Sequence, residues 1–123
     1  MIEKNGLVIV VLYNESMNDE KLSVLCKQVW QQLGTVMDPE LDIDIVSLGL
    51  IYDVEVSGEE IRIIMTLTTP GCPLAPVIDR MIKEAVSAIE GVETSQVVTE
   101  LVWDPPWVSD LMTEEARLQL GIL

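Results

Sequence analysis

The change of apolar spacing around residues 68–73 constrains the fold of this chain more than any other feature of its sequence. Residues 61–68 alternate apolar and polar side chains, which is the pattern of a strand with one buried face. Residues 73–90 instead repeat apolar side chains every three or four positions, the pattern of an amphipathic helix. We therefore predict that a strand passes directly into a helix, with Pro73 as the first helical residue.

Other segments predict the rest of an α-β-β-α-β order. Residues 19–33 have the apolar spacing of a first helix, and residues 95–103 are a third strand. The strand at 50–56 pairs with 61–68 through a tight turn. Its apolar face is expected to contain Leu50, Tyr52, Val54 and Val56.

The expected fold class is α+β, with two helices covering one face of a small sheet in a two-layer arrangement. A single domain is expected over residues 18–123, and a short C-terminal helix from about residue 108. Residues 1–17 look like an N-terminal extension that could add a strand to a sheet edge. Their apolar run at 7–12 is too short for a signal peptide or a membrane span, so we expect a cytoplasmic protein without a membrane partner.

Charge and composition limit the functions that this chain can perform. The net charge is −14, which disfavours nucleic acid as a partner because phosphate groups are repelled. The chain has no histidine, so it lacks the usual general base and the commonest metal ligand. Its chemistry must depend on cysteine, carboxylates, hydroxyl groups or the backbone.

Cys72 is the first candidate functional residue. It lies next to the predicted helix start, where unpaired backbone N–H groups and the helix dipole favour a negative charge such as a thiolate. It could equally be a small residue that fills a turn. The other cysteine, Cys26, falls on the apolar stripe of the first helix and is expected to be buried as a small hydrophobic residue.

Two other segments each allow two interpretations. Residues 38–44 contain four carboxylates, and they form either a metal site or a solvated acidic loop. The spacing does not match an EF-hand loop, and the alternation suggests an extended segment with its acids on one side. Residues 103–107, Trp-Asp-Pro-Pro-Trp, are either an exposed recognition surface or a lid over the core.

Three segments together resemble the SufT/PaaD-like metal–sulfur cluster biosynthesis family. They are "MDPELDIDIVSLGLIYDVEV", "MTLTTPGCPLAPVI" and "VVTELVWDPPWVSDLM", within a resemblance that covers roughly residues 19–116. The SufT-like branch fits better, because the PaaD branch has a longer C-terminal part with more cysteines. The resemblance implies the iron–sulfur-cluster-assembly fold, and it places functional positions at Asp38, Glu40, Thr68, Thr69 and Cys72.

The resemblance also implies an accessory role in assembling iron–sulfur clusters or transferring them to client apo-proteins. A cluster is usually held by four ligands, mostly thiolates, so Cys72 alone would not bind one stably. We expect Cys72 to be a transient ligand of a cluster or of iron, with the assembly machinery as partner and a homodimer as a source of a second thiolate. The alternatives are an adaptor whose cysteine is structural and, less favoured without a histidine base, a Cys72-dependent thiol enzyme.

Overall fold

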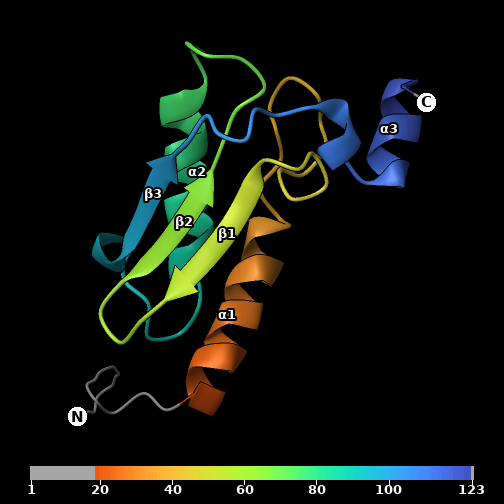
Figure 1. Ribbon diagram of the computed structural model, residues 1–123. Coiled ribbons are helices and arrows are strands. Elements are labelled where there is room, and N and C mark those ends of the chain that lie inside the picture. The colour runs from red at the N-terminus through yellow and green to blue at the C-terminus, as the bar shows by residue number, and fades with distance from the viewer. Residues whose placement is uncertain (1–18, 123) are drawn as a thin grey trace.

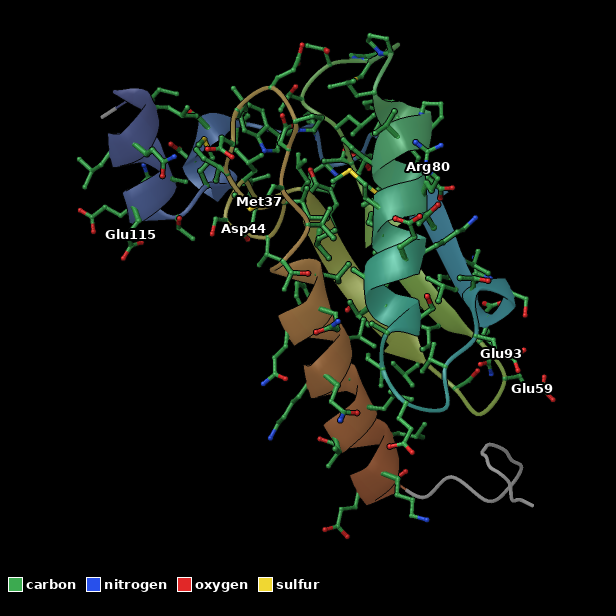
Figure 2. All side chains as sticks on the ribbon, turned by 180° about the vertical axis from the view of Figure 1, so that it is seen from behind. Met37, Asp44, Glu59, Arg80, Glu93 and Glu115 are labelled. Carbon is green, nitrogen blue, oxygen red and sulfur yellow. The ribbon has the colours of Figure 1, made fainter. Side chains whose placement is uncertain are left out.

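The computed structural model describes residues 19–122 and has two layers, a three-stranded sheet and two helices that cover one of its faces (Figure 1). The elements are α1 (Asp19–Leu33), β1 (Ile51–Val56), β2 (Ile61–Met65), α2 (Ala75–Ser87), β3 (Val97–Leu101) and α3 (Glu114–Leu120). Figure 2, seen from behind, shows α1 and α2 in front of the sheet. The α+β fold class is confirmed, whereas the expected strand in residues 1–17 lies outside the described residues.

The strands lie in the order β1-β2-β3, with β1 antiparallel to β2 and β2 parallel to β3. The turn after β1 is closed by a 2.9 Å hydrogen bond from the amide of Ser57 to the carbonyl of Glu60. This topology puts the start of β1 and the ends of β2 and β3 at the same end of the sheet. Residues 34–50, 66–74 and 102–113 all connect there, and we call this the loop end.

The core lies between the sheet and the two helices. Alternate residues of β2 are buried as predicted, and so are Ile78, Ile82 and Val86 on α2. Burying an aliphatic side chain contributes about 1.5–3 kcal/mol, so these faces fix how the helices lie on the sheet. The predicted face of β1 is wrong in part, because an irregularity between Ile51 and Asp53 shifts the register and buries Ile51.

Helix α2 begins later than the sequence pattern predicts. Its N-cap is Leu74, and a 3.2 Å hydrogen bond from the amide of Ala75 to the carbonyl of Cys72 forms a turn just before the helix. The proline of the first helical turn is Pro76, where a missing N–H leaves no helical hydrogen bond unmade. The prediction that Pro73 begins the helix is therefore wrong. No helix in the described part of the chain is long and apolar enough to cross a membrane.

Candidate functional site

Hydrogen bonds between the connecting segments hold the loop end together. Each of the three segments is bonded to another one or to the strand beside it. The backbone bonds run from Thr66 N to Leu50 O (2.8 Å), from Val102 N to Met65 O (2.8 Å) and from Thr113 N to Ser47 O (2.9 Å). These bonds hold residues 34–50, 66–74 and 102–113 next to one another at the loop end (Figure 1). We call them the acidic segment, the cysteine segment and the C-terminal segment.

Cys72 lies in the segment that leads from β2 into α2. Its side chain is half-buried and packs against the core together with Leu74. The preceding Gly71 has a positive φ of 74°, and a side chain built there would meet no atom within 4 Å. Apart from its chain neighbours, Gly71 is therefore open on the side where a side chain would point. Because Cys72 precedes the N-cap by two residues, the helix dipole acts on it from farther away than the sequence predicts.

Three threonines precede the cysteine and differ in exposure. Thr68 and Thr69, the two predicted site residues, are exposed in this segment. Thr66 is fully buried, and its hydroxyl donates a long 3.5 Å bond to the carbonyl of Leu67. Strand alternation missed Thr66, because it places every second residue of this stretch on the solvent side. The exposed pair can contact a partner, whereas Thr66 belongs to the packed interior.

The acidic segment is a closed turn and not the extended stretch that the alternation suggested. The carboxylate of Asp38 accepts hydrogen bonds from the amides of Glu40 (2.8 Å) and Leu41 (3.0 Å). The carboxylate of Asp44 accepts one from the amide of Ser47 (2.9 Å). Aspartate commonly stabilises turns in this way, and these local bonds compete with an extended chain. Two of the four acids thus shape the backbone, while Glu40 is exposed.

The predicted site residues lie at one end of the sheet, but within the described part of the chain no hydrogen bond joins Asp38 or Glu40 to Cys72. Asp38 and Glu40 lie in the segment before β1, and Cys72 lies in the segment after β2. The hydrogen bonds of the Asp38 carboxylate stay within its own turn. Within residues 19–122, no group of three or more cysteine, aspartate or glutamate side chains is arranged to hold a metal ion.

The two interpretations of residues 103–107 apply to different residues. Trp107 is half-buried against the core, and its indole Nε1 donates a 2.8 Å hydrogen bond to the carbonyl of Leu48. Trp103 is 43% exposed. Between them, the carbonyl of Pro105 accepts a 2.7 Å hydrogen bond from the hydroxyl of Tyr52. Trp107 is therefore a lid on the core, while Trp103 is part of the surface.

A group of ion pairs lies away from the loop end, around Arg62 near the start of β2. Its guanidinium contacts Glu100 at 2.9 Å and Glu60 at 2.8 Å. The hydrogen bond to Glu100 and the charge of Glu60 raise the pKa of Arg62 above its ordinary value. These partners hold the arginine on the sheet, at the end opposite the segment of Cys72.

Comparison with known sequences gives matches over most of the chain. The family described as "Iron-sulfur cluster assembly protein" matches residues 27–98. A Bacillus subtilis protein named Fe-S protein maturation auxiliary factor YitW is 43% identical over 99 residues, covering 80% of this chain and 95% of its own length. A Staphylococcus aureus protein named Fe-S protein maturation auxiliary factor SufT is 43% identical over 88 residues, covering 71% and 98%.

A solved structure shows the same fold. It is a domain of unknown function, DUF59, from Bacillus anthracis, and it superimposes with a TM-score of 0.78 at 35% sequence identity. The superposition covers 86% of this chain and all of the other one. The fold of these helices and strands is therefore shared with a protein of related sequence.

Proposed function

This chain belongs to the iron–sulfur cluster assembly protein family, and we propose that it is an accessory factor in iron–sulfur protein maturation that uses Cys72 as a transient ligand. Family membership confirms the resemblance drawn from three segments of the sequence. Two relatives that align over nearly their whole length are named maturation auxiliary factors, which supports the accessory role. The ligand role of Cys72 is our inference from the site.

The observation that carries the proposal is the position of Cys72, a partly exposed cysteine in the connecting turn at the loop end. Cys72 follows Gly71, and apart from the chain neighbours nothing lies within 4 Å of where a side chain on Gly71 would point. A second molecule therefore has room to approach the turn on the Gly71 side. Clusters are bound mostly by thiolates, so a single partly exposed cysteine suits a ligand that is shared and then released.

The proposed ligand exchange conserves protons and electrons. Cys72 loses its thiol proton to solvent when its sulfur coordinates iron. During hand-over, a cysteine thiolate of the recipient replaces Cys72 on the iron, and Cys72 regains a proton. No electron transfer is required, so neither an oxidant nor a reductant enters this step. The cluster or iron is cargo in this scheme and is held only while a partner supplies further ligands.

The other motif residues support the exchange from the same end of the sheet. Asp38 fixes the acidic turn through its bonds to the amides of Glu40 and Leu41. Glu40, Thr68 and Thr69 are exposed, and we assign them to contacts with the partner or its cargo. A second copy of the chain would supply a second thiolate, so a homodimer is part of the proposal. Both cysteines are unpaired, which suits the reducing cytoplasm where we place the protein.

An adaptor with a structural cysteine is the second candidate. It is favoured by one observation, the packing of Cys72 against the core beside Leu74. A thiol enzyme is disfavoured because a cysteine nucleophile normally needs a base at hydrogen-bonding distance, and the chain has no histidine to provide it. We therefore propose a role without catalysis.

Anaerobic reconstitution tests the ligand role. The full chain is incubated with ferrous iron, sulfide and a small thiol, and the visible absorbance of cluster formation is recorded. Cys72→Ser should abolish the protein-bound absorbance, while Cys26→Ser should retain it as the matched control. Equal uptake by Cys72→Ser and the unmodified chain would contradict the ligand role and favour the adaptor.

A further inference from the structure

Trp103 lies on a surface strip formed by residues 102–111, which we call the rim. Figure 1 shows this part of the chain leaving β3 and crossing the loop end toward α3. Three large apolar side chains on it are substantially exposed. They are Trp103 (43%), Val108 (50%) and Leu111 (42%). Single exposed apolar residues are ordinary, but three within nine residues of one connecting segment make that segment a candidate interaction surface.

The backbone that carries Trp103 is held on both sides. The amide of Val102 donates a 2.8 Å hydrogen bond to the carbonyl of Met65, and the carbonyl of Pro105 accepts a 2.7 Å bond from the hydroxyl of Tyr52. An exposed tryptophan on a fixed backbone loses little conformational entropy on binding. Tryptophan is also among the residues that most often dominate binding energy in protein interfaces.

The rim begins beside the segment that contains Cys72. Leu101 and Met65 are the last paired residues of β3 and β2. The chain to Trp103 and the chain to Cys72 therefore leave the sheet from the same rung of neighbouring strands. A partner seated on Trp103 would be close to the segment from which the proposed cargo is passed.

Charge indicates which kind of partner fits. Residues 34–50, 66–74 and 102–122 contain eight aspartate or glutamate residues and a single basic residue, Arg117. The guanidinium of Arg117 is already used, since it donates a 2.9 Å hydrogen bond to the carbonyl of Met112. Exposed apolar side chains in an acidic setting complement a segment that is both apolar and positively charged.

We propose that the rim docks a protein partner through an apolar, positively charged segment of that partner, with Trp103 as the main anchor. This inference rests on the proposed function, because the partner would be the protein that donates or receives the cargo. An acidic surface also repels nucleic acids and anionic membranes, which leaves a protein as the occupant.

Peptide binding to the full chain tests this assignment. The probe is a fluorescently labelled synthetic peptide of leucine and lysine that forms an amphipathic helix. A control peptide has glutamate in place of lysine. Binding of each peptide is measured by fluorescence anisotropy. The lysine peptide should bind and the glutamate peptide should not. Trp103→Ala and Val108→Ala should each weaken binding about tenfold or more. Val24→Ala, at a residue 52% exposed on α1, should change it less than about twofold.

Three results would overturn the proposal. They are no binding of the lysine peptide, binding that survives both rim substitutions, or an equal loss in Val24→Ala. Sedimentation tests whether a second copy of this chain occupies the rim. If the unmodified chain is a dimer and Trp103→Ala dissociates it, the rim is an interface between two copies and the proposal fails. Cys72→Ser should bind the peptide normally, so failure of the ligand role and failure of the docking role give different results.

Discussion

The indole Nε1 of Trp107 donates a 2.8 Å hydrogen bond to the carbonyl oxygen of Leu48. This bond links the segment after β3 to the segment before β1, across 59 residues of sequence. It closes the loop end over the core, because Trp107 also packs against the buried residues. The stability of the loop end should therefore depend on Trp107 much more than on Trp103.

Replacing Trp107 by phenylalanine should lower the free energy of unfolding by about 1 kcal/mol or more. The aromatic packing is largely kept, but the buried carbonyl loses its donor, and a net hydrogen bond is worth about 0.5–1.5 kcal/mol. Urea unfolding measures the change. Trp103→Phe is the control and should stay within about 0.5 kcal/mol. A similar loss in both variants would argue against the lid role of Trp107.

Gly49→Ala should destabilise the fold more than Gly91→Ala. Both glycines have positive φ, 78° and 87°, where an L-residue costs about 1–2 kcal/mol. At Gly49 the added methyl would also lie 2.7 Å from Cβ of Leu111 and against its carbonyl, whereas nothing lies within 4 Å at Gly91. Overpacking adds about 1–3 kcal/mol. Thermal unfolding that ranks the two variants equally would show that Leu111 does not pack on Gly49.

Thr113→Ala should weaken α3 without affecting the sheet. The side chain of Thr113 accepts a 3.1 Å hydrogen bond from the amide of Ala116, and losing such a cap costs about 1 kcal/mol. Hydrogen exchange should speed up in Glu114–Leu120 and not in β2. Thr113→Ser keeps a capping hydroxyl and should leave exchange nearly unchanged. If Thr113→Ser behaves like Thr113→Ala, the capping hydroxyl is not what holds α3.

Cys72 should react with iodoacetamide faster than Cys26 in the folded protein. Both cysteines are half-buried and contact the core, but Cys72 lies in a connecting turn next to the open side of Gly71, while Cys26 lies within α1. Each rate is measured in the variant that lacks the other cysteine, Cys26→Ser or Cys72→Ser. In denaturant the two rates should converge. Equal rates under native conditions would contradict the accessible position assigned to Cys72.

The sequence predicts the helices and strands well because they are set by local apolar spacing. Residues 19–33 match α1 as observed, and residues 61–65 form β2 with the predicted face buried. The predicted start of α2 fails at Pro73, since a turn between Cys72 and Ala75 competes with the first helical turn. Periodicity describes the interior of an element, whereas its boundary depends on which local hydrogen bonds form.

The loop end is less predictable because long-range and turn-specific bonds determine it. The carboxylate of Asp38 forms bonds within its own turn, and nothing in apolar alternation indicates them. The different exposure of Trp103 and Trp107 follows from the bond to Leu48, which is distant in sequence. The motif residues all lie in segments at the loop end, but the sequence alone does not say which of their side chains are exposed there.

The most direct test of the ligand role is rescue in cells that lack the endogenous factor, with the activity of an iron–sulfur enzyme as the readout. The unmodified chain and Cys26→Ser should both restore the activity. Cys72→Ser should accumulate to the same level and fail to restore it, because the cargo loses its transient ligand. Full rescue by Cys72→Ser would contradict the account and leave the protein as an adaptor with a structural cysteine.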